Sequence, residues 1–213
     1  MILYGFDRSP PVRACLMTLK ALDISFEFKN VHVMNREHLT PEFLKMNPIH
    51  TVPVLEDGEH FITDSHVICT YLVQKYGSEK DQSLYPKDLI ERTVVDQRLF
   101  FDLGVLFVRF KAVTAHIFTS NKTEIPKEKF DAIIESYDFL ETFLDVNKFV
   151  AGKILTVADI CCMASVTSMT FVPLDPCRHP KTISWFERMQ YLPFYSVNRT
   201  GSKVLVDFIK QFI

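Results

Sequence analysis

The sequence lacks the cysteine patterns of a disulfide-bonded or zinc-binding protein. Its 213 residues include five cysteines, an odd number of which two are adjacent, and neither a Cys-x-x-Cys motif nor a Cys/His spacing that suits zinc. These absences exclude a disulfide framework and a structural zinc site. We therefore expect a reduced cytoplasmic protein that holds no metal.

Long hydrophobic runs are also missing. The first residues have neither the basic start nor the long apolar stretch of a signal peptide, and no run of 18 uncharged apolar residues occurs. The apolar stretch from Phe100 to Val108 contains Asp102 and is followed by Arg109. The sequence predicts a soluble chain outside the membrane, and we interpret its two glycosylation sequons, at Asn121 and Asn198, as chance matches.

Neither sign of charge dominates, because 24 Lys+Arg oppose 26 Asp+Glu and the net charge is −2. This balance excludes strong electrostatic attraction to nucleic acid or to anionic lipid. Hydrophobic residues make up 47% of the chain, which is ample for a buried core. The single Trp contrasts with 19 Phe, a ratio that suits an apolar pocket, although Phe also packs ordinary cores.

Strand and helix signals alternate over residues 1–77. The patterns predict strands at residues 2–5, 26–33, 52–55 and 61–63, and helices at residues 10–22, 41–46 and 65–76. The last two strands flank Asp57 and Gly58, a pair typical of a hairpin turn. The order β-α-β-α-β-β-α predicts a compact α/β domain.

The strand signals stop at a polar segment, residues 78–85, which we interpret as a linker. Residues 86–213 predict an all-helical domain, beginning with one long helix from Leu89 to about Phe118 in which Gly104 allows a bend. The next helix begins at Pro126. Thr156 and Asp159 form a capping-box pattern before a helix that we expect to be central, and the last two helices are expected around residues 182–191 and 203–212.

Ser9 follows the first strand and precedes the prolines that open the first helix. One interpretation is that it only caps this helix. The other is that its hydroxyl and the helix N–H groups face an anionic ligand atom, where the helix dipole lowers a thiol pKa by about one or two units. Because no local base or Gly-x-Ser-x-Gly turn accompanies Ser9, it suits a hydrogen-bond donor better than a nucleophile.

Two further loops hold candidate binding residues. Pro53 stands where a strand begins, so it is either an ordinary strand-entry proline or a cis-proline that leaves the Val52 backbone free to pair with a peptide-like ligand. Asp64 or Ser65 is expected to cap the next helix. A carboxylate beside a hydroxyl and helix N–H groups also suits the ammonium and carboxylate of an amino-acid head group.

Three basic residues are candidates for anion binding. His38 and His50 bind an anion when protonated, although most histidines are ordinary core or surface residues. Arg109 is isolated on an apolar helix face and requires a partner if it is buried. That partner is either a ligand carboxylate or an acid of the protein, such as Asp102.

Together these motifs resemble those of the cytosolic glutathione S-transferases. The resemblance is closest to the insect epsilon class, with the sister delta class second, and it covers essentially the whole chain. The segments that carry it are Ile2-Leu3-Tyr4, Ser9-Pro10-Pro11-Val12-Arg13, Asn47-Pro48-x-His50-Thr51-Val52-Pro53, Asp64-Ser65-His66, Leu84-Tyr85-Pro86-Lys87-Asp88 and Leu155-Thr156-Val157-Ala158-Asp159.

The resemblance implies a homodimer with a thioredoxin-like glutathione-binding domain at residues 1–77, a linker at 78–85 and an all-helical electrophile-binding domain at 86–213. It implies an enzyme of detoxification that joins the thiolate of reduced glutathione, a co-substrate rather than a cofactor, to apolar electrophiles. Ser9 matches the catalytic serine, which hydrogen-bonds the thiolate. The residues that match the glutathione-binding positions are His38, His50, Thr51, Val52, Pro53, Asp64, Ser65, His66 and Arg109.

The resemblance defines the electrophile pocket less closely. From their positions we expect it to be lined by Phe6, Arg8, Val108, Ala112 and Phe208. Asp64 stands where this class often has Glu, and we expect the shorter side chain to be tolerated.

Two other functions stay open from the sequence. Glutathione-dependent thiol–disulfide exchange requires a cysteine where Ser9 stands, whereas Cys15 lies almost two turns further along the helix. The third hypothesis is a non-catalytic or narrow-specificity carrier of an apolar ligand such as a steroid. Turnover, as opposed to tight binding alone, separates a transferase from such a carrier.

Overall fold

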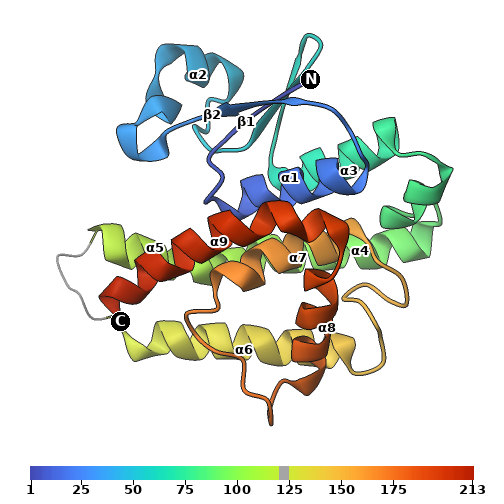
Figure 1. Ribbon diagram of the computed structural model, residues 1–213, viewed down its shortest axis with the longest axis vertical. Coiled ribbons are helices and arrows are strands. Elements are labelled where there is room, and N and C mark those ends of the chain that lie inside the picture. Colours follow the sequence, from blue (N-terminus) through green and yellow to red (C-terminus); the bar gives the residue numbers. More distant parts are fainter. Residues whose placement is uncertain (120–124) are drawn as a thin grey trace.

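The computed structural model describes residues 1–119 and 125–213, with a sheet packed on helices at one end and a helical bundle at the other (Figure 1). Within the described residues, the strands β1 (Ile2–Gly5), β2 (Glu27–Asn30), β3 (Val54–Asp57) and β4 (His60–Thr63) form one sheet in the order β2-β1-β3-β4. β1 is parallel to β2 and antiparallel to β3, and β3 is antiparallel to β4. This is the α/β arrangement that the sequence predicts.

Two helices lie between the sheet and the helical bundle. α1 (Pro10–Ala21) and α3 (Ser65–Tyr76) pack against each other, and Leu3, Leu55 and Ile68 are fully buried in the shared core (Figure 1). A Cβ on Gly5 would lie 2.6 Å from Cγ1 of Val12, so glycine at the end of β1 lets α1 pack closely. The short α2 (Pro41–Met46) completes this half of the chain.

The predicted strand at residues 26–33 is shorter than expected. β2 ends at Asn30, and a 3-10 helix, Val33–Asn35, follows it. All four residues of β2 are exposed, since it is an edge strand. The alternation of apolar residues that predicted a strand up to Val33 therefore includes residues that follow β2 and lie outside the sheet, such as the buried Val31.

The second half of the chain is helical, as predicted. Its helices are α4 (Leu89–Phe101), α5 (Phe107–Thr119), α6 (Lys127–Leu144), α7 (Val157–Ser168), α8 (Pro180–Gln190) and α9 (Ser196–Ile209). The single long helix expected from Leu89 is instead two helices joined by a π-helical turn, Asp102–Leu106. The expected linker contains a 3-10 helix, Glu79–Leu84, and the domain division at 78–85 stays a prediction.

The α7 helix is central, because each of its side chains is buried. Its predicted capping box is present: the Thr156 backbone N–H and Oγ1 donate to Oδ2 of Asp159 at 2.9 and 3.1 Å. Oδ1 of Asp159 accepts from Val150 N–H at 2.8 Å and from Trp185 Nε1 at 3.0 Å. Burial raises the pKa of Asp159 to about 6, although these hydrogen bonds oppose the shift.

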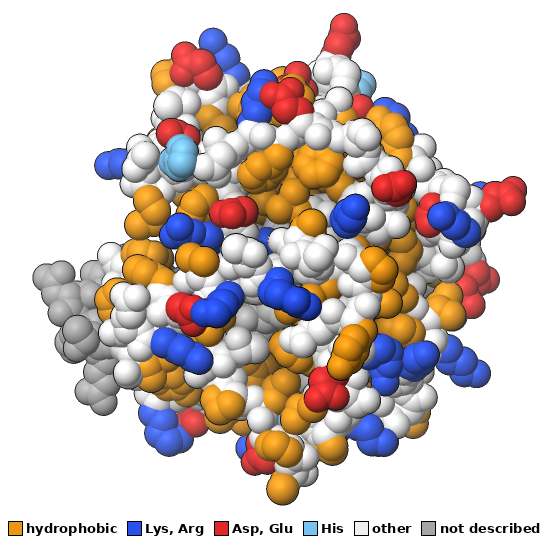
Figure 2. All heavy atoms as spheres, viewed as in Figure 1, with side chains coloured by type: hydrophobic (Ala, Val, Ile, Leu, Met, Phe, Trp, Pro, Cys, Tyr) orange, Lys and Arg blue, Asp and Glu red, His pale blue; other side chains and the backbone are white. Residues whose placement is uncertain are grey.

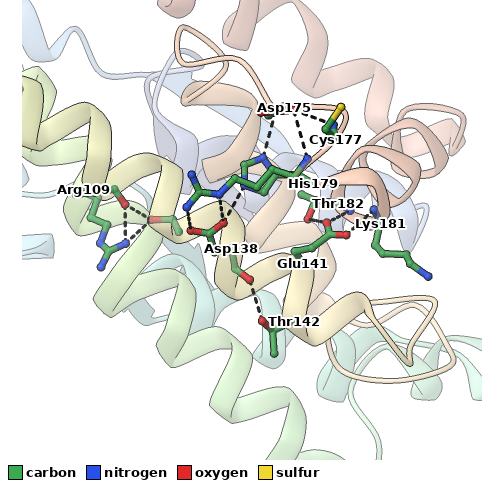
Figure 3. Close-up of polar contacts among 12 residues, drawn as sticks. Arg109, Asp138, Glu141, Thr142, Asp175, Cys177, His179, Lys181 and Thr182 are labelled. Carbon is green, nitrogen blue, oxygen red and sulfur yellow. Dashed lines mark hydrogen bonds and ion pairs between the residues drawn. The ribbon is translucent and has the colours of Figure 1, made fainter.

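Polar contacts bind the helices to one another. Arg13 of α1 is fully buried, and its Nη2 donates to the Ala164 carbonyl at 3.3 Å and to Oγ of Ser168, so it joins α1 to α7. Burial lowers the pKa of Arg13 to about 9. On the opposite side of the bundle, Glu141 of α6 accepts from the backbone N–H groups of Lys181 and Thr182 at 2.9 and 2.8 Å, which caps α8 (Figure 3).

Acidic and basic side chains are interspersed over the face shown in Figure 2, with hydrophobic side chains between them. All five cysteines are free thiols. Asn198 is fully buried and donates to Thr167 Oγ1 at 3.2 Å, which leaves no room for a glycan, while the Asn121 sequon lies outside the described residues. In the part of the chain that the structure describes, no helix is long and apolar enough to cross a membrane.

Candidate functional site

Ser9 stands at the N-terminus of α1, and its hydroxyl is not used as a cap. The Ser9 N–H donates to the Phe6 carbonyl at 2.8 Å and its carbonyl accepts from Arg13 N–H at 3.0 Å, but its side chain makes no capping hydrogen bond. Pro10 and Pro11 have no N–H, so Val12 is the first helical residue with a backbone donor. The hydroxyl therefore stays available for a ligand at the positive end of the helix dipole.

The loop before β3 presents a free backbone edge. The Val52–Pro53 peptide bond is cis, and pairing with β1 begins at Val54, so Val52 lies outside the ladder. The buried Asn47 holds this loop: its Nδ2 donates to the Thr51 carbonyl at 2.9 Å and to Thr51 Oγ1 at 3.0 Å. The N–H and C=O of Val52 are thus positioned for an extended, peptide-like ligand.

Asp64 is the residue that caps α3. Its Oδ1 accepts from the backbone N–H groups of His66 and Val67 at 2.9 and 3.2 Å. The interaction with the His66 side chain is the main cause that lowers the pKa of Asp64, against the effect of burial. Asp64 has a φ of 67°, in the left-handed region, and such backbone strain is found preferentially at functional sites.

His66 joins the two halves of the chain. Its Nε2 lies 2.8 Å from Oδ2 of Asp102 in the π-helical turn, and its Nδ1 lies 3.3 Å from Oδ1 of Asp64. Burial on its own lowers the pKa of His66, but the hydrogen bond to Asp102 and the ion pair with Asp64 outweigh it and raise the pKa to about 10. His66 is therefore an imidazolium at neutral pH, held between two carboxylates.

His38 and His50 form a pair on the other side of the loop. Their ring centroids are 6.2 Å apart, and Nδ1 of His38 is buried without a hydrogen-bond partner. Burial lowers the pKa of His38, and the charges of His50 and Arg36 add to this effect. An anion bound between the two rings would supply the missing partner and favour the protonated form.

These elements surround one cavity of about 430 Å³. It brings together every predicted glutathione-binding residue except Arg109. The first half of the chain contributes Pro11, Val33, His38, Ile49, His50, Thr51, Val52, Pro53, Thr63, Asp64, Ser65 and His66, and the opposite wall consists of Leu103, Phe107 and Lys111. Ser9 does not line this cavity directly but lies at the same helix start as Pro11.

Arg109 lies away from this cavity. Its guanidinium donates to the Ala132 carbonyl at 2.6 Å and Ser136 Oγ at 3.0 Å, and pairs with Glu135 at 2.5 Å, all on α6 (Figure 3). The expected contact with glutathione is therefore not supported by the geometry. Residues advance by about 100° each in a helix, so Arg109 points roughly 200° away from Phe107 when Phe107 faces the cavity.

The residues of the opposite wall were missed by the sequence analysis. Leu103, Phe107 and Lys111 recur every four residues, a spacing that marks one helix face, but the π-helical turn changes the phase between α4 and α5. The lining that we expected from Phe6, Arg8, Val108, Ala112 and Phe208 stays a prediction. Among these residues, the Arg8 guanidinium lies 5.5 Å from the Phe6 ring centroid, Phe208 stacks on Phe118, and Val108 is about half exposed.

Comparisons with known proteins find one family along the chain. The family model "Glutathione S-transferase, N-terminal domain" matches residues 3–80, and "Glutathione S-transferase, C-terminal domain" matches residues 95–193. The predicted fold class, a thioredoxin-like domain followed by an all-helical one, is thereby confirmed.

Individual relatives match nearly the whole chain. An epsilon-class glutathione S-transferase from the housefly Musca domestica has 52% identity and a TM-score of 0.95, covering 99% of this chain and 97% of that one. A glutathione transferase homologue from Drosophila mojavensis, with bound glutathione, has 46% identity and a TM-score of 0.95, covering 99% and 96%. Glutathione S-transferase 1 of Manduca sexta is 42% identical over 213 residues, 98% of this chain and 97% of that protein.

Proposed function

The chain belongs to the glutathione S-transferase family, and on that premise we propose that it joins the sulfur of reduced glutathione to apolar electrophiles, with Ser9 stabilising the thiolate. The observation that carries the role of Ser9 is its uncommitted hydroxyl at the N-terminus of α1. A hydrogen bond from this hydroxyl and the helix dipole both favour the thiolate over the thiol. A thiol pKa lowered by about one or two units leaves much more thiolate at neutral pH.

The cavity offers complementary groups to each part of glutathione, the co-substrate. Asp64 and the start of α3 at Ser65 suit the ammonium and carboxylate of the γ-glutamyl head. The backbone of Val52 suits the cysteinyl amide, and His38 with His50 suits the glycyl carboxylate. In this arrangement the sulfur points towards the start of α1, and the electrophile lies against Leu103 and Phe107.

The reaction itself needs little from the protein beyond the thiolate and its position. The thiol proton leaves to solvent, the sulfur forms a bond to the electrophilic carbon, and the leaving group departs with its electron pair. For an aryl chloride, the carbon–chlorine bond breaks and chloride is released. We propose that this chemistry serves detoxification in the cytoplasm.

The test is the rate at which the purified protein conjugates glutathione to 1-chloro-2,4-dinitrobenzene. Ser9→Ala should retain glutathione binding and lose at least about tenfold in kcat, because only the hydrogen bond to the thiolate is removed. Ser83→Ala, which truncates an exposed serine of the 3-10 helix Glu79–Leu84, should leave the rate unchanged. An unchanged rate in Ser9→Ala refutes the role of Ser9, and glutathione binding without turnover in the wild type favours a carrier.

We also propose that the chain forms a homodimer through α3 and α4. Val67 and Phe100 are 52% and 72% exposed beside a cavity of about 500 Å³ that they help to line, and a second copy related by a two-fold axis can place its own Phe100 there. In analytical ultracentrifugation, Phe100→Asp should shift the dimer to a monomer. Phe118→Asp, a change of another exposed Phe, should not. A wild-type monomer contradicts the proposal.

A further inference from the structure

Lys111 adds a positive charge to the apolar wall of the cavity. Its side chain is exposed and lines the cavity together with Leu103 and Phe107. Over residues 1–119 and 125–213, its ammonium has no carboxylate within ion-pair distance. The nearest aromatic contact is weak, because its Nζ lies 6.0 Å from the Phe107 ring centroid. The ammonium is thus available to a ligand.

The other charges around the cavity do not neutralise Lys111. Asp64 contributes the one carboxylate among the described lining residues, and it is already engaged by His66. Glu135, an acid of the neighbouring α6, is paired with Arg109 on a different face of α5. The remaining titratable lining groups, His38 and His50, are basic as well. Among residues 1–119 and 125–213, no acidic side chain neutralises Lys111, so the charge is open to an anionic ligand group.

The spacing along the helix indicates where this charge meets a ligand. Lys111 follows Phe107 by four residues, so it lies on nearly the same helix face and about 6 Å further along the axis. That distance is about the length of one aromatic ring. An electrophile whose ring packs against Leu103 and Phe107 can therefore extend a substituent to the Lys111 ammonium.

We infer that Lys111 is a specificity-determining residue that selects electrophiles with an apolar ring and an anionic substituent, such as a carboxylate. This inference rests on the proposed glutathione-conjugating function and narrows its substrate class. The carboxylate pairs with the ammonium at the outer end of the apolar wall. The reacting carbon stays at the inner end, near the sulfur.

A suitable probe is 4-chloro-3-nitrobenzoate, compared with its neutral amide, 4-chloro-3-nitrobenzamide. In both compounds the glutathione sulfur bonds to the carbon that carries chlorine, the negative charge of the adduct is spread over the ring and nitro group, and chloride leaves with the bonding electrons. The two compounds differ only in the group that would meet Lys111. Because the two groups also activate the ring to different extents, the change in their kcat/KM ratio between the wild type and a Lys111 variant reports the contribution of the contact with the carboxylate.

The ratio of acid to amide is measured in the wild type and in Lys111→Met, Lys111→Glu and Lys153→Met. We expect it to fall about twofold to fivefold in Lys111→Met and further in Lys111→Glu, the range for an exposed ion pair. Raising NaCl to about 0.5 M should lower the wild-type ratio, because salt screens such a pair. Lys153→Met removes an exposed lysine outside the cavity lining and should leave the ratio unchanged.

An equal ratio in the wild type and Lys111→Met overturns the inference. The inference is also overturned if Lys111→Met raises the KM for glutathione equally with both substrates, because Lys111 would then bind a carboxylate of glutathione. If neither compound is turned over, 3-nitrobenzoate and 3-nitrobenzamide are compared as inhibitors of 1-chloro-2,4-dinitrobenzene conjugation, with the same expectation for the ratio of their inhibition constants. If the wild type conjugates glutathione to none of these electrophiles, 1-chloro-2,4-dinitrobenzene included, the proposed function itself is refuted.

Discussion

The ion pairs of His66 should make the protein less stable as the pH rises above neutral. Its pKa is raised to about 10 in the folded chain, whereas an unfolded histidine has a pKa of about 6.5. The stabilising contribution is therefore fully present below about pH 6.5 and is lost as the pH rises through about 10. Between these values the folded chain retains a proton that the unfolded chain has released.

The size of this effect follows from the two pKa values. Their difference corresponds to at most roughly 5 kcal/mol of stabilisation at low pH. His66 is only 9% exposed, so solvent screens the pairs with Asp64 and Asp102 only weakly. Because one proton is released on unfolding, the free energy of unfolding should decrease by about 1.4 kcal/mol per pH unit, or about 2 to 3 kcal/mol from pH 7 to pH 9.

Urea unfolding of the wild type and of His66→Gln, at fixed protein concentration between about pH 6 and pH 9, measures this contribution. His66→Gln should lack this part of the pH dependence and should be less stable at pH 7 by about 3 kcal/mol, because Asp102 is left buried without its partner. The double variant His66→Gln/Asp102→Asn should recover part of the loss. Equal pH slopes in the wild type and His66→Gln would refute the reasoning.

Three substitutions test other parts of the structure. Asp159→Ala leaves four buried donors unpaired, Trp185 Nε1 among them. The Tm measured by calorimetry should therefore fall by about 5 to 15 °C, and a fall of less than about 2 °C would contradict this. Gly201→Ala drives a Cβ into the Asp7 carbonyl, two residues before Ser9. It should lower the free energy of unfolding by about 1 to 3 kcal/mol and reduce conjugation. Gly104→Ala meets no atom within 4 Å and should stabilise the protein by up to about 1 kcal/mol in the same urea assay.

Local sequence signals predicted most of the fold. Prolines and capping residues mark helix starts because they act within one turn, and so the beginnings of α1, α3 and α7 were placed correctly. The hairpin around Asp57 and Gly58 is equally local. The break between α4 and α5 was missed, because an apolar run that fits one long helix does not reveal a π-helical turn.

In the candidate site, too, the residues whose positions depend on local structure were predicted, and those that depend on distant packing were not. His50, Pro53 and Asp64 lie next to the elements that hold them, and the structure brings them together in one cavity. Arg109 is paired with α6 outside this cavity, and Lys111, which lines it, was not recognised. The sequence does not reveal this, because the direction of a side chain on α5 depends on the phase set by the preceding turn. The link from His66 to Asp102 spans 36 residues, and no local pattern shows which acid the histidine meets.

The most direct test of the central claim is the pKa of the glutathione thiol when it is bound to the protein. Thiolate absorbance in the ultraviolet, titrated against pH, measures it in the wild type and in Ser9→Ala. We predict that the wild type lowers the thiol pKa of bound glutathione by about one to two units. Ser9→Ala should still bind glutathione, but the thiol pKa should rise most of the way back to its value in free glutathione. An equal thiol pKa in both proteins would contradict the account of Ser9.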